Sequence, residues 1–146
     1  MDQVAVVVSL ILAAALAVAV PSEEQMLRGI YGVESSFGAN AVDGDLDKPL
    51  CERSRGGYQV TPRAVRELVR VGMLKPMRGF SLTNCAAIRE WLGKPGNNKR
   101  AARLYLRLML QRTGGDVERA LCKYNGIDAP GCVYAGQVLA IASGEG

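Results

Sequence analysis

A length of 146 residues gives room for one domain with a single hydrophobic core. Hydrophobic residues make up 49% of the chain, and 18 lysine and arginine residues against 14 acidic residues give a net charge of +4, which favours anionic partners. The absence of histidine excludes Ser/His/Asp and Cys/His nucleophiles, and aromatic residues at 5% argue against stacking on nucleic-acid bases.

The chain begins with an apolar run. From residue 4 to residue 20 there is no charge, and Ser9 is the only polar side chain. As a helix this run would rise about 25 Å, slightly less than the roughly 30 Å hydrocarbon core of a bilayer. Ala17-Val18-Ala19 offers a cleavage site, although residues 1–3 carry no lysine or arginine. We therefore expect residues 1–20 to be a signal peptide or a membrane anchor, since a buried core helix is rarely so apolar. Both place residues 21–146 outside the cytosol.

The first helix of the domain has clear boundaries in the sequence. Ser22 and Gln25 have the spacing of a capping box. Apolar residues then recur at helical spacing up to Val33, and Gly38 supplies a stop, so Glu34 lies in the last turn. Residues 38–60 are rich in glycine and aspartate and lack periodicity. This segment is too long for an idle connection, so we expect a functional loop or a small β-hairpin there, with two or three short strands at most.

The rest of the chain predicts further helices. Thr61 and Pro62 are expected to be the cap and the first residue of one helix, and Ser81 or Thr83 the cap of a short helix that ends at Gly93. A turn at residues 95–98 is then expected to precede a long helix over residues 99–112. A helix from Asp116 through Tyr124 and a last helix over residues 133–142 complete the prediction. We therefore expect a mainly α fold: a single helical domain with a small loop or β-hairpin region, preceded by an N-terminal hydrophobic helix.

Four cysteines, Cys51, Cys85, Cys122 and Cys132, fit an exported domain that gains stability from cross-links. Four cysteines allow three pairings. We favour Cys122–Cys132, which closes a short loop and leaves Cys51 to pair with Cys85. A zinc site is not expected, because the chain has neither histidine nor a Cys-x-x-Cys motif. We expect no metal and no cofactor.

Five segments follow one another in a characteristic order. They are Glu34-Ser35-Ser36-Phe37 with Asn40-Ala41-Val42, Ser54 through Pro62, Leu106-x-x-Met109-Leu110 with Gly114-Gly115-Asp116, Ala120 through Asn125, and Tyr134-Ala135-x-x-Val138-Leu139. This series, over nearly all of residues 22–142, resembles the lysozyme-like superfamily, and most closely the soluble lytic transglycosylase (SLT) type of peptidoglycan-cleaving domain. The chain departs from the family pattern at Gly57-Tyr58, where Leu-Met or Pro-Tyr is usual, and at Lys123, where alanine is more common.

The resemblance implies that Glu34 is the catalytic acid, and an apolar setting from Ile30, Val33 and Phe37 would keep its proton near neutral pH. It also implies that Tyr124 lies over the cleft with its hydroxyl toward Glu34, although periodicity alone would make Tyr124 a half-buried core residue. The other residues expected around the substrate are Ser35, Ser36, Gly57, Tyr58, Gln59 and Asn125. Ser35 and Ser36 could equally be caps, whereas glycines allow a close backbone approach and the Gln59 amide could bond an N-acetyl group.

A second carboxylate would decide the reaction class. A hydrolase of this kind uses a pair of carboxyl groups, and Asp43, Asp45, Asp47 and Glu52 are candidates, with Asp45 preferred. The resemblance implies that none is needed, because Glu34 would protonate the leaving group and then deprotonate the muramic acid 6-hydroxyl, which yields a 1,6-anhydro sugar.

We therefore expect a lytic transglycosylase that cleaves the MurNAc-GlcNAc β-1,4 bond of peptidoglycan. It would be exported, either periplasmic, anchored in the inner membrane through residues 4–20, or associated with a virion. Its small size favours local wall opening for a secretion or conjugation apparatus or for phage entry. The alternatives are a lysozyme-type hydrolase on the same fold and a catalytically silent wall-binding or structural component of a membrane-spanning machine.

Overall fold

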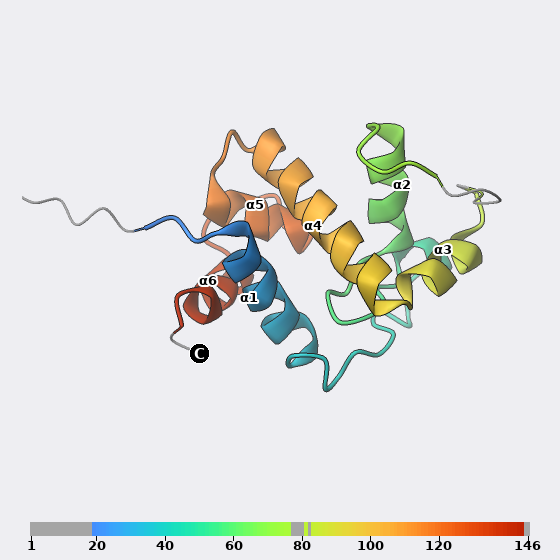
Figure 1. The fold of residues 1–146 in the computed structure, drawn as a ribbon, viewed down its shortest axis with the longest axis horizontal. Helices are drawn as coiled ribbons and strands as arrows, with labels where there is room; N and C mark the ends of the chain where they lie inside the picture. Colours follow the sequence, from blue (N-terminus) through green and yellow to red (C-terminus); the bar gives the residue numbers. More distant parts are fainter. Residues whose placement is uncertain (1–18, 77–80, 82, 145–146) are drawn as a thin grey trace, which may run out of the picture.

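The computed structural model describes residues 19–76, 81 and 83–144 (Figure 1). This part of the chain is mainly helical, as the sequence predicts, and none of its helices is long and apolar enough to cross a bilayer. The N-terminal hydrophobic helix expected over residues 4–20 lies almost entirely outside the described residues. The elements are α1 (Glu23–Ser35), the short 3₁₀ helix η1 (Leu50–Glu52), α2 (Pro62–Arg70), α3 (Cys85–Leu92), α4 (Pro95–Arg112), α5 (Val117–Tyr124) and α6 (Val133–Ala142).

Four helices begin where the sequence predicts, among them α6 at Val133. Ser22 and Gln25 form the capping box of α1, in which each side chain bonds the backbone of the other residue. Thr61 caps α2, with Pro62 as its first residue, and Asp116 caps α5. Side-chain oxygens thus satisfy N–H groups that have no partner inside the helix.

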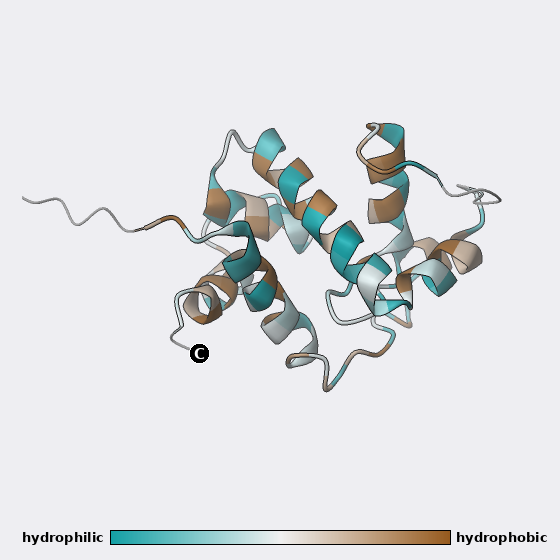
Figure 2. Cartoon of the chain, in the orientation of Figure 1, coloured by the Kyte–Doolittle hydropathy of each residue, from teal (hydrophilic) through white to brown (hydrophobic). Residues whose placement is uncertain are grey.

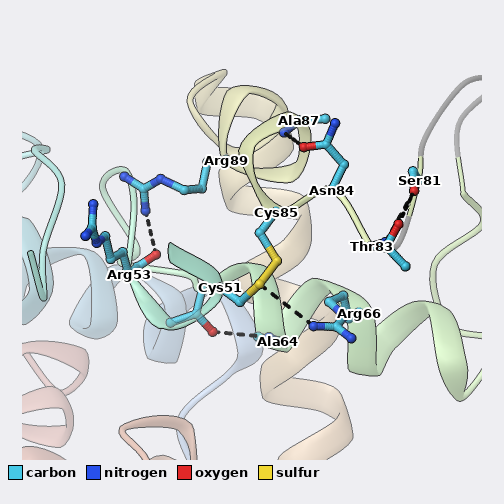
Figure 3. Close-up of a disulfide and its surroundings, with 11 residues drawn as sticks. Cys51, Arg53, Ala64, Arg66, Ser81, Thr83, Asn84, Cys85, Ala87 and Arg89 are labelled. Atoms are coloured by element: carbon cyan, nitrogen blue, oxygen red, sulfur yellow. Dashed lines mark hydrogen bonds between the residues drawn. A yellow bond between two sulfur atoms is a disulfide. The ribbon is translucent and has the colours of Figure 1, made fainter. Parts of the chain in front are cut away.

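Two expected helix starts were wrong. The cap of α3 is Asn84, whose amide oxygen accepts a hydrogen bond from the Ala87 N–H at 3.1 Å, whereas the hydroxyls of Ser81 and Thr83 bond each other (Figure 3). Helix α4 begins at Pro95, so residues 95–98 form its first turn and not a separate turn. Proline suits this position because its fixed φ is helical and its missing N–H would have had no partner.

Helix α4 is the central element of the fold. It runs between α1, α5 and α6 on one side and α2 and α3 on the other (Figure 1). Hydrophilic and hydrophobic residues alternate along α4, whereas α6 is mainly hydrophobic (Figure 2). The largest fully buried side chains come from both groups and from α4 itself: Leu27, Ile30, Val65, Leu68, Ile88, Leu92, Leu106, Leu121 and Val138. One core therefore unites all six helices.

The packing of α1 against α6 is tight enough to require a glycine. A Cβ added at Gly29 would lie 2.4 Å from the carbonyl oxygen of Val138. The two backbones therefore approach each other without an intervening side chain. This contact fixes the direction of α1 and hence the position of Glu34 at its end.

Residues 38–60, where the sequence predicts a functional loop or a small β-hairpin, form the loop. The described part of this segment contains a single antiparallel bridge, between Arg55 and Val60, and no strand. Gly56 and Gln59 both have positive φ, at 77° and 48°, which interrupts the extended conformation that a strand requires. The segment ends where α2 begins, at Pro62, two residues after Val60.

Buried side chains hold this loop in place of a strand ladder. The Nδ2 atom of Asn98 donates to the carbonyls of Arg55 at 2.7 Å and Leu92 at 3.1 Å, and its Oδ1 atom accepts from the Tyr58 N–H at 2.9 Å. The buried guanidinium of Arg89 donates to the Arg53 carbonyl at 2.7 Å (Figure 3). Helices α3 and α4 thereby fix the backbone of the loop.

The structure contains two disulfides, and their pairing is the one favoured from the sequence because Cys122–Cys132 closes a short loop. Cys51–Cys85 joins η1 to the start of α3 (Figure 3), and Cys122–Cys132 joins α5 to the cap of α6. Each cross-link therefore lies within one of the two helix groups that α4 separates.

Candidate active site

A cleft of about 1360 Å³ lies between the end of α1, the loop before α2, helices α2 and α4, and the end of α5. The end of α1 contributes Glu34, the loop before α2 contributes Asp45 and Gln59, and α2 and α4 supply one long wall. Tyr124 and Asn125, at the end of α5, complete the lining. Of the eight residues singled out for catalysis and substrate binding, Glu34, Gln59, Tyr124 and Asn125 line this cleft, and so does Asp45.

The carboxyl group of Glu34 titrates near physiological pH. The pKa of Glu34 is raised to about 7, first because the carboxyl is largely buried and second because the charge of Asp45 lies nearby. The hydroxyl of Tyr134 acts in the opposite direction and lowers this pKa. Roughly half of such carboxyl groups keep their proton at pH 7. Glu34 is therefore able to donate a proton and to accept one.

Only part of the apolar setting expected around Glu34 is present. Ile30 is fully buried and Val33 is half-buried beneath the last turn of α1. Phe37, in contrast, is 52% exposed and packs edge-on against the ring of Tyr31, with 6.3 Å between the ring centres. It lies outside the cleft lining. The main cause of the pKa shift is therefore burial within the helical core.

The tyrosine that faces Glu34 is Tyr134. The Tyr124 hydroxyl donates to the carbonyl of Tyr58 at 3.0 Å, so it does not form the bond to Glu34 that the resemblance implies. The Tyr134 hydroxyl is buried and forms no well-aligned hydrogen bond with any described residue. It is nevertheless close enough to Glu34 to stabilise the carboxylate. Burial raises the pKa of both tyrosines, so both hydroxyls stay protonated. Sequence reasoning quoted Tyr134 as part of the last segment but gave it no role.

Asp45 is held in place by its own loop. Its backbone has a positive φ of 57°, its Oδ1 atom lies 3.1 Å from Lys48 Nζ, and its Oδ2 atom lies 3.1 Å from the Ser54 hydroxyl. The Ser54 hydroxyl also lies 2.6 Å from Gln59 Oε1. The Ser54 hydroxyl has one proton, for which Asp45 Oδ2 and the closer Gln59 Oε1 compete, so the ion pair with Lys48 is the contact that holds Asp45. Its negative charge is fixed beside Glu34.

The amide of Gln59 is occupied by the loop. Its Nε2 atom donates to the carbonyl of Val42 at 2.7 Å and to that of Gly56 at 2.8 Å. A Cβ added at Gly44 would lie 2.3 Å from Gln59 Oε1, so this glycine makes room for the amide. Gln59 lines the cleft as expected, but in this structure its hydrogen bonds shape the wall and leave the amide no N–H for an N-acetyl group.

The glycine turn serves packing. A Cβ added at Gly57 would lie 2.2 Å from the ring of Tyr31, and the buried Tyr58 ring stacks on the same ring at 4.9 Å. Neither Gly57 nor Tyr58 lines the cleft. The requirement for glycine at residue 57 thus comes from an aromatic neighbour inside the protein.

Ser35 and Ser36 have the capping roles that were the alternative reading. The buried Ser35 hydroxyl donates to the Tyr31 carbonyl at 3.0 Å and accepts from the Gly38 N–H at 2.9 Å. Ser36 is exposed, adopts a left-handed conformation with φ of 50°, and caps the C-terminus of α1. Together they turn the chain away directly after Glu34, and neither lines the cleft.

Sequence reasoning missed a cleft residue on α4. The sequence gives Tyr105 no role, but it lines the cleft and packs against Tyr124 with 5.5 Å between the ring centres. The ring face of a tyrosine is a common surface for the apolar side of a sugar. The helical spacing could not separate Tyr105 from core residues, because the cleft wall and the core lie on adjoining faces of α4.

The other acidic loop residues do not converge on Glu34. Asp43 pairs with Arg55 at 3.2 Å and with Arg89 at 2.9 Å, outside the cleft lining. Asp47 is exposed and also outside it, whereas Glu52 lines the cleft and pairs with Arg63 at 3.6 Å. Within the described ranges, no three Cys, Asp or Glu side chains gather as a metal site would require.

Comparison with known proteins gives one family assignment. The family model described as "Transglycosylase SLT domain" matches residues 10–133 of the chain. No curated protein and no solved structure matches it.

Proposed function

This chain belongs to the transglycosylase SLT domain family, and we propose that it is a lytic transglycosylase that cleaves the MurNAc-GlcNAc β-1,4 bond of peptidoglycan. The observation that carries the proposal is the carboxyl of Glu34, with its pKa near 7, in the wall of a cleft of about 1360 Å³. Cleavage of a glycosidic bond needs an acid that still holds its proton at the working pH.

The proposed reaction uses Glu34 twice. In the first step its carboxyl gives a proton to the glycosidic oxygen, the bond from that oxygen to C1 of the muramic acid breaks, and positive charge develops at C1. In the second step the Glu34 carboxylate takes the proton of the muramic acid 6-hydroxyl as its oxygen bonds to C1. The product is a 1,6-anhydro sugar, no water is consumed, and Glu34 regains its proton. A pKa near the ambient pH suits both transfers.

The surroundings of Asp45 support a reaction with one catalytic carboxyl. A second catalytic carboxylate would have to activate water or attack C1. One oxygen of Asp45 is paired with Lys48, and the other competes with Gln59 for the single proton of the Ser54 hydroxyl. We propose that Asp45 acts on Glu34 through its charge, which helps to keep the Glu34 proton in place. The rival is a lysozyme-type hydrolase in which Asp45 is the second carboxylate.

Product analysis tests the proposal. Purified peptidoglycan is incubated with the protein, the released fragments are separated by chromatography, and their molecular masses are determined by mass spectrometry. Anhydro-ended fragments are expected. Fragments with reducing ends would identify a hydrolase, and retained binding without release would identify a silent wall-binding domain.

Variants of Glu34 and Asp45 assign the roles. Glu34→Gln is expected to lower the rate by at least about 100-fold, because general acid catalysis contributes roughly 10²–10⁴. Glu90→Gln, the same change at an exposed site on α3, is the matched control and keeps full activity. Asp45→Asn still yields anhydro ends if the proposal holds, whereas a hydrolase that needs both carboxylates loses its activity.

We further propose that the protein acts outside the cytosol, in the periplasm, at the inner membrane or on a virion, where it opens the wall for a secretion, conjugation or phage machine. Two disulfides, Cys51–Cys85 and Cys122–Cys132, support an oxidising compartment. Fractionation of the native producer or of purified phage tests this location, and recovery in the reduced cytosol alone contradicts it.

A further inference from the structure

A stripe of arginines lines the long wall of the cleft. Arg63, Arg66 and Arg70 stand at intervals of three and four residues on α2, so they lie along one face of the helix. All three line the cleft, together with Arg112 from α4 and Lys48 from the loop. A neutral polysaccharide does not require such a wall, because sugars are bound by hydrogen bonds and ring contacts.

Acidic residues of the same wall neutralise only part of this charge. Glu67 pairs with both Arg70 and Arg112, and Glu52 pairs with Arg63. Apart from Glu34, the described lining has five cationic side chains and three acidic ones. The wall therefore keeps an excess of positive charge beside the substrate cleft.

Among the described residues, Arg66 is the member of the stripe that has no acidic partner. Within the described part of the chain, the polar contact of its guanidinium is with the sulfur of Cys51, 3.9 Å from Nη1 (Figure 3). The residue is exposed, and Figure 3 shows its side chain reaching from α2 toward the disulfide. A weak sulfur contact leaves most of the five N–H donors available for a ligand.

The chemistry of these donors specifies the ligand. A guanidinium binds a carboxylate through two parallel N–H···O bonds, which gives both strength and orientation. In peptidoglycan the glycan is neutral, and the carboxylates belong to the peptide stems attached to the lactyl group of the muramic acid. A strand that lies in the cleft with a muramic acid at Glu34 directs its stems to the walls.

We propose that Arg66, with Arg63 and Arg112, binds the carboxylates of the peptide stems, so that the protein selects glycan strands that carry stems over strands that lack them. This inference rests on the proposed function and assigns its substrate preference to the arginine stripe of α2.

The test compares two substrates that differ only in their stems. One is a set of soluble glycan strands with intact stems, stripped of other anionic wall polymers. The second is the same set after an amidase has removed the stems and the lactyl carboxyl groups thus freed have been amidated, so that the bare strands are neutral. For the unmodified protein, stem removal is expected to raise KM by about tenfold, the worth of one charge-assisted hydrogen bond of about 1.5 kcal/mol. Arg66→Gln is expected to raise KM by a similar factor on stem-bearing strands and to leave KM on bare strands unchanged.

Arg100→Gln is the matched control. Arg100 is an exposed arginine of α4 that does not line the cleft, so the variant makes the same change in net charge. It is expected to behave as the unmodified protein on both substrates. The proposal is overturned if Arg100→Gln and Arg66→Gln have equal effects, if Arg66→Gln weakens both substrates alike, or if the unmodified protein cleaves both substrates equally well.

A binding measurement separates this inference from the proposed function. The Glu34→Gln variant is sedimented with glycan strands coupled to beads, either with their stems or after stem removal and amidation of the lactyl carboxyl groups, with and without Arg66→Gln. Stem-dependent binding that Arg66→Gln abolishes supports the inference even if no strand is cleaved. The inference is overturned, and the proposed function stays intact, if the unmodified protein cleaves normally but the amount of variant bound is the same with and without stems and with and without Arg66→Gln.

Discussion

At the residue scale, Glu34 combines reactivity with a cost in stability. Its pKa of about 7 in the folded protein exceeds the ordinary value of 4.5, so the folded state holds this proton more tightly than the unfolded state does. The free energy of unfolding therefore falls as the pH rises from about 4.5 to about 7 and is constant above that range with respect to this group. The shift corresponds to about 3 kcal/mol.

Glu34→Gln is expected to remove this cost. At pH 8 the variant should be more stable than the unmodified protein by up to about 3 kcal/mol, whereas at pH 4, where both forms of the site are neutral, the difference should vanish. Denaturant unfolding of both proteins at the two pH values measures this. Glu90→Gln, on an exposed site, should show no such pH dependence. Equal stability of Glu34→Gln and the unmodified protein at pH 8 would mean that Glu34 ionises with an ordinary pKa.

Sequence reasoning found Glu34 but not its tyrosine partner. A carboxyl at the end of a capped amphipathic helix, followed by a glycine stop, is visible in the sequence, and so is the order of the five segments. Tyr124 and Tyr134 both occupy apolar faces of their helices, and spacing does not tell which way a buried hydroxyl points. In the structure the Tyr124 hydroxyl donates to the carbonyl of Tyr58, which lies 66 residues earlier in the sequence. Tyr134 is therefore the tyrosine whose hydroxyl lies near Glu34.

At the element scale, the loop before α2 depends on the first turn of α4. Pro95-Gly96-Asn97-Asn98 consists of residues that favour turns, which is why the sequence predicts a turn there. The buried amide of Asn98 instead supplies three hydrogen bonds to the loop and to the end of α3. Of the two predicted alternatives, a loop and not a hairpin forms for the same reason, because the groups that hold residues 53–59 come from α3 and α4 and not from a neighbouring strand.

Asn98→Ala is expected to destabilise the protein by about 2–4 kcal/mol, because it leaves the Tyr58 N–H and the carbonyls of Arg55 and Leu92 without their partner. Denaturant unfolding measures the loss, and hydrogen exchange should show faster exchange in residues 53–59. Asn97→Ala is the control next to it: Asn97 is half-buried and donates one bond, to the Trp91 carbonyl at 3.0 Å, so its loss should cost about 1 kcal/mol. Equal effects of the two variants would contradict the role of Asn98.

At the scale of the whole molecule, α4 divides the domain into two groups of helices, and the cleft draws its lining from both. Glu34 and Tyr124 belong to the group of α1, α5 and α6, whereas the arginine stripe belongs to α2. The loop that carries Asp45 and Gln59 connects the two groups. Catalytic geometry therefore depends on how firmly the loop is tied to the group of α2 and α3, and the Cys51–Cys85 disulfide is the covalent part of that tie.

The two disulfides should consequently differ in their effect on activity. Cys51–Cys85 spans 34 residues and Cys122–Cys132 spans 10, so loop-closure entropy assigns them about 4 and about 3 kcal/mol of stability. Replacing either pair by alanine should thus lower the free energy of unfolding by similar amounts, as measured by denaturant unfolding. Cys51 lines the cleft, whereas Cys122 is fully buried in the core.

For this reason, at a temperature where both variants are folded, removal of Cys51–Cys85 should lower kcat/KM on peptidoglycan severalfold, and removal of Cys122–Cys132 should leave it nearly unchanged. Circular dichroism at the assay temperature verifies that both are folded. If both variants lose activity in proportion to their stability alone, the loop is held by its hydrogen bonds to Asn98 and Arg89, and the disulfide contributes to the fold without shaping the cleft.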